Sequence, residues 1–537
     1  MKPSIACRAS ATASSFESGI MSSLSSRIAS RSADPIPALV WRASLAGLCA
    51  ILLAPLLLVE VPPLLDYPNH LARLFVLALG GNDPVVAGFY TARWSIIPDL
   101  GIDLIGPPLI HVLPIHVAGR VLIGLVLLLP VLGAIAYSQA LLGRRSWWSL
   151  GCGLVAYHQT FMLGFLNFTA GMGLALWLAA VWLRGRESHP ARTVALTALG
   201  CVGLYFCHLM GVVFLGVLIA AYELAWLLEF PRSRLLAPRI VLLRFAAAAS
   251  VFVVPLALYA GSALSREAGG LVYLTAPGKL EQLLAPWTNY LLPFDIATGV
   301  ATVGALVFLS IRRQLRVPRQ AAIALVLLGV MYLVCPFAYA GVINIDMRVV
   351  VLAGFVLFTG LAPVRLPSWL VMGMVVLFVA RIGVVAVAWH GHTETIATLR
   401  SVIASVPTGS TVFVSTMRPE NRFGIADARR LSSGVSTTNH LPALLLIERR
   451  AWWPFMFDNE SQQPIATRSP YLELALQADR MPEDRRQIPA SACDLAGFDY
   501  VLMLGRLVDA PAFLTPVAAA ARVSLYRVAH AGCPPPR

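Results

Sequence analysis

Polar side chains that could take part in catalysis gather in one short stretch, Pro62 to Arg73, directly after the first long apolar run. Asp66 supplies a carboxylate, Asn69 an amide, His70 an imidazole and Arg73 a guanidinium. The prolines that open the stretch lack backbone donors, so the preceding helix ends there and Asp66 or Asn69 can cap the next one. His70 and Arg73 would share one face of that helix. The stretch is therefore either a reaction site at a membrane edge or a capped interfacial helix with a snorkelling arginine.

The composition indicates a polytopic membrane protein. Hydrophobic residues make up 58% of the chain and charged residues only 13%, whereas soluble proteins carry about 25% charged residues. The net charge of +14 would suggest nucleic acid in a soluble domain. Here the arginines lie in short clusters between apolar runs, where they set topology, so we exclude nucleic acid as a partner.

The arginine clusters predict the direction of each membrane crossing. By the positive-inside rule all of them face the cytosol. The apolar stretch 146–183 reaches about twice the ~30 Å hydrocarbon core, so it should cross twice and turn near Asn167. The same reasoning along the chain predicts about eleven spans, with the N-terminus inside and the Asp66 stretch and C-terminal tail outside. The clusters are Arg144–Arg145, Arg184–Arg192, Arg232–Arg239, Arg312–Arg319 and, more weakly, Arg365.

The expected fold is mainly α, a polytopic helical membrane domain followed by a C-terminal extracytoplasmic α/β domain. Residues 1–37 are rich in Ser and Ala and should form a disordered cytosolic tail. Residues 38–390 form the membrane domain, whose first outer loop, 62–116, is apolar enough to form amphipathic interfacial helices. Residues 391–537 alternate helix and strand, as in a small α/β domain.

The C-terminal domain carries two further expectations. Strands are predicted over residues 411–415, 500–504 and 523–528. Cys493 and Cys533 lie outside the membrane in this topology, where they could form a disulfide.

The topology and the Asp66 stretch together resemble the GT-C glycosyltransferase superfamily, which includes protein O-mannosyltransferases and lipid A aminoarabinose transferases. Members of that superfamily carry an acidic residue just after the first helix and use a polyprenyl-phosphate sugar as donor. They often carry two adjacent acids, whereas Tyr67 follows Asp66 here. The resemblance implies an enzyme of the bacterial inner membrane that transfers a sugar to an envelope acceptor on the outer face. It does not identify that acceptor.

Such a reaction needs a carboxylate to accept a proton and cations to stabilise the departing phosphate. Asp66 is the candidate base, oriented by His70. Arg73, Arg348 and Arg381 are the candidate phosphate ligands, because guanidinium groups pair with phosphate in a bidentate manner. The spans would form an apolar groove for the polyprenyl chain and contact membrane lipids. Further candidates for the site are Asn69, Asp99, Asp103, His208 and Asp346.

Arg381 should lie about 18 Å inside the membrane, since it follows Trp369 by twelve residues. An arginine there costs about 2.5 to 3.5 kcal/mol on insertion scales and usually faces a cavity or a partner. A structural ion pair or a snorkelling side chain is an equal alternative.

No cofactor is certain from the sequence, and a divalent metal is an open alternative because several histidines fall near the outer side. Their spacing does not match a metal motif, which favours a hydrogen-bonding role and leaves the metal site unknown. These histidines are His70, His111, His116 and His208.

Two other classes of function are compatible with the sequence. A transporter or flippase for a lipid-linked or anionic solute would show inverted repeats and broken helices near the bilayer midplane. A non-catalytic envelope assembly protein would keep its function when Asp66 is replaced by Asn. Neither class explains the polar residues of the Asp66 stretch.

Overall fold

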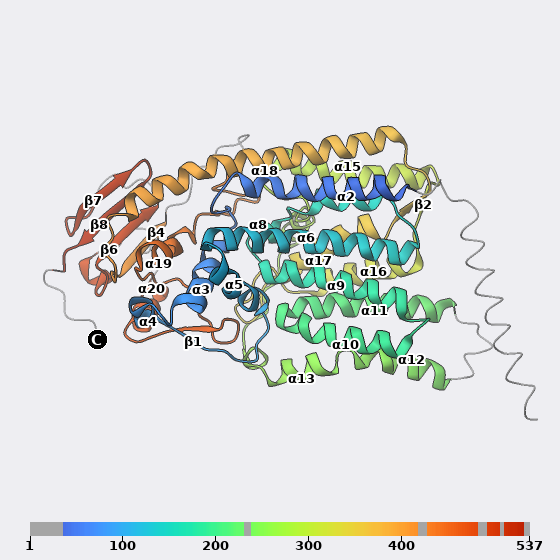
Figure 1. The fold of residues 1–537 in the computed structure, drawn as a ribbon, viewed down its shortest axis with the longest axis horizontal. Coiled ribbons are helices and arrows are strands. Elements are labelled where there is room, and N and C mark those ends of the chain that lie inside the picture. Colours follow the sequence, from blue (N-terminus) through green and yellow to red (C-terminus); the bar gives the residue numbers. More distant parts are fainter. Residues whose placement is uncertain (1–35, 230–237, 417–426, 482–490, 505–509, 531–537) are drawn as a thin grey trace, which may run out of the picture.

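The fold is known from a computed structural model that describes residues 36–229, 238–416, 427–481, 491–504 and 510–530. A bundle of long helices forms one part of the molecule, and a smaller α/β unit covers one end of it (Figure 1). Two predictions involve residues outside these ranges. They are the disordered tail, since residues 1–35 are not described, and the Cys493–Cys533 disulfide, since Cys533 is not described. Cys493 takes part in a disulfide.

The mainly α membrane class is confirmed. Seven described helices are long and apolar enough to cross a membrane, counting α2 with the short turn that follows it, and the bent pair α12–α13 makes an eighth. The helices of the bundle are α2 (Ala38–Leu53), α6 (Ile115–Leu142), α9 (Leu166–Gly185), α10 (Pro190–Cys207), α11 (Leu209–Glu229), α12 (Pro238–Ser250), α13 (Val253–Gly261), α15 (Leu292–Ile311), α16 (Arg319–Val334), α17 (Ile345–Thr359) and α18 (Ser368–Ile403).

The other three predicted crossings take different forms. The helices α16 and α17 have only 16 and 15 residues, fewer than the roughly 20 that a perpendicular span needs. The crossing predicted before Asn167 is broken into α7 (Trp147–Leu150), η3 (Gly151–Val155) and α8 (Gln159–Met162). Glycines in this segment weaken the helix and allow close packing, since a Cβ on Gly153 would lie 2.7 Å from a neighbouring leucine methyl group.

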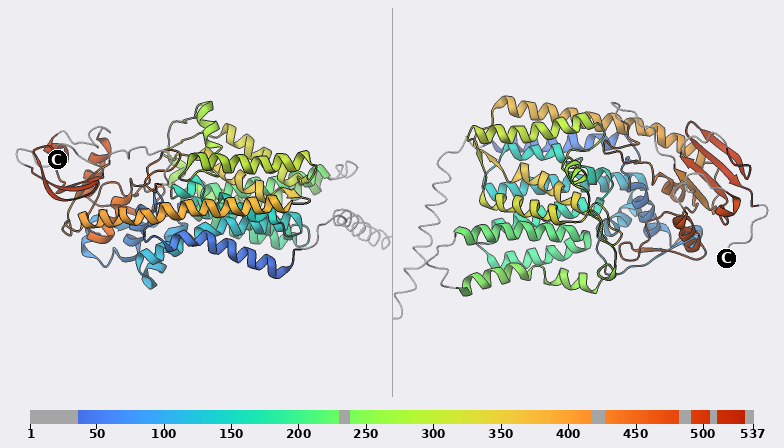
Figure 2. Two further views of the ribbon diagram at one scale, coloured as in Figure 1. Left: turned by 90° about the horizontal axis from the view of Figure 1, so that it is seen from above. Right: turned by 180° about the vertical axis from the view of Figure 1, so that it is seen from behind.

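The basic residues of the clusters that fall within the described ranges lie at one end of the bundle, whereas Arg232 and Arg234 lie outside those ranges. Arg145 donates to the carbonyl of Ile36, and Arg144 donates to the carbonyl of Pro363. Close by, β2 (Leu315–Arg316) pairs antiparallel with β3 (Ala362–Pro363). The α/β unit lies at the opposite end (Figures 1 and 2).

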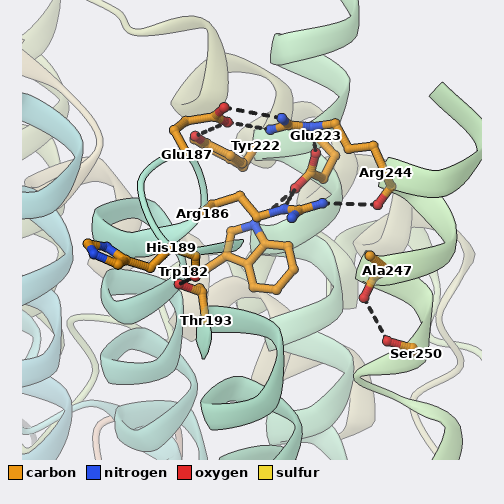
Figure 3. A network of polar contacts seen from close by, with 10 residues as sticks. All are labelled: Trp182, Arg186, Glu187, His189, Thr193, Tyr222, Glu223, Arg244, Ala247 and Ser250. Atoms are coloured by element: carbon orange, nitrogen blue, oxygen red, sulfur yellow. Dashed lines mark hydrogen bonds and ion pairs between the residues drawn. The ribbon is translucent and has the colours of Figure 1, made fainter. Parts of the chain in front are cut away.

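Charged side chains buried between the helices near the basic end are paired (Figure 3). Glu223 of α11 accepts hydrogen bonds from Trp182 at 3.1 Å and from Arg186 at 3.0 Å. Trp182 lies in the last turns of α9, and Arg186 directly follows that helix. Arg244 of α12 also donates to Glu223 and pairs with Glu187 at 2.6 Å. Because a buried carboxylate is costly unless it is paired, this network is part of the helix packing.

The first outer loop forms short helices, as predicted, together with one strand. Its elements are α3 (Tyr67–Leu79), α4 (Pro84–Phe89), β1 (Tyr90–Ala92) and α5 (Gly101–Val112). The predicted capping by Asp66 or Asn69 is wrong: α3 begins at Tyr67, one residue before Pro68, and no side chain caps it. Proline is tolerated in a first helical turn, so the helix starts earlier and leaves both polar side chains to other partners.

The C-terminal unit contains a four-stranded sheet in the order β4-β6-β8-β7, with β4 and β6 parallel and the other pairs antiparallel. The three predicted strands are confirmed within one residue. The strands are β4 (Val412–Thr416), β6 (Tyr500–Leu504), β7 (Leu514–Ala520) and β8 (Val523–Val528). The helical segments of this unit are η6 (Leu441–Ala443), α19 (Leu444–Arg449), α20 (Tyr471–Arg480) and η7 (Ala492–Leu495).

Two features join the C-terminal unit to the bundle. The helix α18 runs without a break from the bundle to the sheet (Figure 1), so it passes through the domain boundary expected at residue 391. In addition, β5 (Ile465–Thr467) pairs antiparallel with β1, so that Tyr90 lies opposite Thr467. The remaining elements are η2 (Ala54–Leu57), η5 (Ala263–Arg266) and α14 (Ala276–Gln282).

Candidate active site

Asp66 is held by its backbone against the broken segment of the bundle. Its amide donates to the carbonyl of Leu163 at 3.1 Å, and the amide of Leu65 donates to that of Met162 at the same distance. Gly164 follows with φ of +84°, and a Cβ at this position would lie 2.7 Å from the Asp66 nitrogen. Only glycine fits here without strain. The break in the bundle therefore places Asp66 at the end of the helices that faces the C-terminal unit.

The Asp66 carboxyl group is poised between its protonated and ionised forms. Burial raises its pKa to about 7, while the positive charges of Arg348 and Arg73 oppose this shift. Its Oδ1 atom lies 3.5 Å from Nε2 of His440, a residue of the C-terminal unit. A carboxylate with a pKa near neutrality can serve as a general base at physiological pH.

Arg348, at the start of α17, provides a cation whose guanidinium has an N–H donor without a partner among the described residues. The guanidinium lies over the rings of Phe165 and Phe168, at 5.0 and 5.7 Å from their centroids. Its Nη2 donates to the carbonyl of Ile343 at 3.3 Å, while Nε is buried and has no hydrogen-bond partner among the described residues. Arg348 interacts electrostatically with both Asp66 and Asp99.

Asp99 and His208 form a second carboxylate–imidazole pair on this site. Asp99 Oδ1 lies 3.5 Å from His208 Nε2. Burial raises the pKa of Asp99 to about 6 against the charge of Arg348. The Asp99 backbone is left-handed, with φ of +69°, and it accepts a hydrogen bond from the side chain of Asn167. Asn167 also accepts from the amide of Ile102 at 2.8 Å, so it fixes the loop that carries Asp99.

Arg73 and Asp103 form a buried ion pair between α3 and α5, next to the site. Arg73 donates to both carboxylate oxygens of Asp103, at 2.7 and 2.9 Å, and both side chains are fully buried. Arg73 is thus largely occupied and joins α3 to α5. His70 faces the ring of Phe457 with centroids 5.6 Å apart, and burial, together with the charge of Arg73, holds its pKa well below the usual value. It is therefore a neutral imidazole.

Two of the predicted residues lie apart from this cluster. Arg381 donates to Asp295 and Thr298, both at 3.1 Å, and to the carbonyl of Trp287. This is the structural ion pair that the sequence left open. Asp346, in the first turn of α17, accepts from Lys279 of α14 at 2.7 Å, so it joins these two helices. The other predicted residues are connected to Asp66 directly or through Arg73, Arg348 or His440.

Among the described residues no group of three or more His, Cys, Asp and Glu side chains gathers in a way that could hold a metal ion. His111 is exposed, and His116 lies 3.7 Å from Glu60 and 3.8 Å from Glu448, away from Asp66. The residue that sequence reasoning missed is His440. The only signal near it was the aromatic run 452–457, whose backbone binds Asn69.

No protein-family model and no curated protein sequence matches the chain. The crystal structure of ArnT from Cupriavidus metallidurans bound to undecaprenyl phosphate is similar to it, with a TM-score of 0.52 over 93% of this chain and 100% of that chain. The chain therefore shares the fold of this ArnT structure. At 11% sequence identity this likeness concerns the fold alone. Roles for individual residues must therefore come from the geometry of the site.

The Arg381–Asp295 pair yields a stability prediction. Arg381→Met should lower the free energy of unfolding by about 3–5 kcal/mol, because it leaves the buried Asp295 carboxylate without its cation. Arg319→Met is the control, since its pair with Glu229 is exposed and is worth about 0–1 kcal/mol. Unfolding of the purified protein in detergent measures both. Equal stability of the two variants would contradict a structural role for Arg381.

Proposed function

We propose that the protein is a glycosyltransferase of the bacterial inner membrane. It moves a sugar from a polyprenyl-phosphate donor to an envelope acceptor on the outer face. The observation that carries the proposal is the partly buried Asp66 carboxyl group and its electrostatic interaction with Arg348, whose guanidinium keeps an unused donor. The GT-C fold and the undecaprenyl phosphate in the ArnT crystal structure support it.

Arg348 is the proposed ligand of the donor phosphate. A guanidinium offers paired N–H groups that match phosphate oxygens, and such charge-assisted hydrogen bonds are strong where water is excluded. Arg348 lies in the first turn of α17, so a phosphate bound there would have its lipid chain running between the bundle helices and its sugar facing the C-terminal unit. As the sugar leaves, this cation would stabilise the charge that develops on the phosphate.

Asp66 is the proposed base. It would accept the proton of the acceptor hydroxyl or amine while the bond from the sugar to the phosphate breaks and the new bond to the acceptor forms. Asp99, which lies near His208 and interacts electrostatically with Arg348, would accept hydrogen bonds from the sugar or the acceptor. His70 and Asn69 would shape the wall of the site, and Arg73 would keep Asp103 and α5 in place.

The proposed orientation follows from charge. The arginine clusters at the end of the bundle opposite the C-terminal unit would face the cytosol, with the N-terminus on the same side. The Asp66 site and the C-terminal unit would then lie on the outer face, where the lipid-linked donor and the acceptor meet. No divalent metal is assigned a role.

One observation favours the transport alternative. The bundle contains a segment broken into three short pieces and a pair of helices bent by 45°, features that transporters use near the bilayer midplane. The broken segment ends next to the Asp66 backbone, however, at the end of the bundle that faces the C-terminal unit. This position suits an enzyme site better.

A deletion strain tests the proposed function in cells. Mass spectrometry should show the loss of one envelope glycan and the accumulation of its polyprenyl-linked donor. Wild-type protein should restore the profile and Asp66→Asn should not, because an amide cannot accept the proton. Glu281→Gln, which neutralises an exposed carboxylate, is the control and should restore it. Restoration by Asp66→Asn at normal protein levels would favour transport or assembly.

Arg348 gives a second prediction, for binding. Arg348→Gln should weaken binding of polyprenyl phosphate to the purified protein at least tenfold, since a charge-assisted hydrogen bond contributes about 1.5–3 kcal/mol. Asp66→Asn should bind the same ligand as tightly as the wild type, or more tightly, because it removes a negative charge near the phosphate. Titration of each detergent-purified variant with polyprenyl phosphate measures both affinities. Unchanged affinity of Arg348→Gln would place the phosphate elsewhere.

A further inference from the structure

Asn69 of α3 is bound from three sides by the C-terminal unit, and these contacts fix its amide orientation. Its side chain is fully buried. Oδ1 accepts a hydrogen bond from the amide of Phe457 at 3.0 Å, and Nδ2 donates to the carbonyl of Phe455 at 2.8 Å. Because a backbone amide can only donate and a carbonyl can only accept, the oxygen and nitrogen of Asn69 cannot be exchanged.

This orientation also determines where His440 carries its proton. The second hydrogen of Asn69 Nδ2 points to Nδ1 of His440, 3.1 Å away. An amide nitrogen cannot accept a hydrogen bond, so His440 Nδ1 must be the unprotonated acceptor. The ring proton is then on Nε2, the atom that lies 3.5 Å from Asp66 Oδ1.

We infer that His440, supplied by the C-terminal unit, is a positioning residue that directs an N–H group at the Asp66 carboxylate, with its tautomer set by Asn69. The inference rests on the proposed function, since it assigns a role within that site. It means that the active site is completed only when the C-terminal unit is docked on α3.

His440 remains a neutral donor rather than a second cation. Protonation at Nδ1 would set two donors against each other, Nδ1–H and the amide of Asn69. Burial lowers the pKa of His440 to about 4, in agreement with this geometry. The imidazole is also held between the rings of Trp453 and Phe457, at centroid distances of 6.2 and 5.0 Å.

The charged and titratable groups that face Asp66 explain why a neutral donor is needed. Arg348 approaches from α17, Arg73 and His70 belong to α3, and His440 comes from the C-terminal unit. Arg73 is already paired with Asp103. If Arg348 binds the donor phosphate, the Nε2–H group of His440 is the donor left to hold Asp66 in its ionised form.

Two substitutions of His440 separate the two ring nitrogens. His440→Asn places a carbonyl oxygen near Nδ1, which keeps the acceptor for Asn69 and removes the donor to Asp66. His440→Gln reaches the Nε2 position with an amide donor. The control is His390→Gln, an exposed histidine on α18. We would measure transfer from a polyprenyl-phosphate sugar by full-length protein in detergent as a function of pH.

The wild-type rate should rise with pH as Asp66 ionises. In His440→Asn the maximal rate should fall tenfold or more with little change in KM for the donor. The acidic limb of kcat/KM should move up by about one pH unit or more, because the ionised carboxylate loses the N–H group directed at it. His440→Gln should keep the wild-type limb and most of the rate. A limb that stays in place in His440→Asn, or moves equally in both variants, would overturn the inference. Absence of transfer by the wild type would instead contradict the proposed function.

Discussion

The site depends on one electrostatic constraint, the partial burial of two carboxyl groups, those of Asp66 and Asp99, that both interact with the Arg348 guanidinium. Burial raises the pKa of both acids, to about 7 and about 6, because the charged forms lose water. A single guanidinium that interacts with two such groups lowers the cost of ionising either one. It also keeps donors free for an anionic ligand, which could then share the cation with the carboxylates. The same low-dielectric surroundings would strengthen each of these interactions during a reaction.

The rest of the structure holds these three residues in register. The bundle helix before Asn167 is broken, and the break brings Gly164 against the Asp66 backbone. Asn167 holds the left-handed turn at Asp99. The Arg73–Asp103 pair joins α3 and α5 of the first loop next to the site. Strand β5 pairs with β1, and the backbone of the aromatic run 452–457 binds Asn69, so the C-terminal unit also takes part in positioning.

The sequence was most informative where chemistry and membrane topology act locally. Asp66, Asn69, His70 and Arg73 are neighbours on the chain, so their shared position followed from helix periodicity, and the arginine clusters fixed which ends of the helices lie together. Arg348 could be proposed because it lies at the outer end of a predicted span. Arg381 could not be separated from a structural arginine, since its partner Asp295 is 86 positions away. His440 could not be found at all: it is 371 positions from Asn69, and the contact exists only after the C-terminal unit docks.

The most direct test is a single-turnover measurement with purified full-length protein and a synthetic polyprenyl-phosphate sugar offered with an envelope extract as the source of acceptor. Wild-type protein should release polyprenyl phosphate and form a glycosylated product, with a rate that rises with pH around a midpoint near 7, the pKa of Asp66. Asp66→Asn should bind the donor and release nothing. Turnover by Asp66→Asn at the wild-type rate, or a wild-type rate that does not change between pH 5 and 8, would contradict the account.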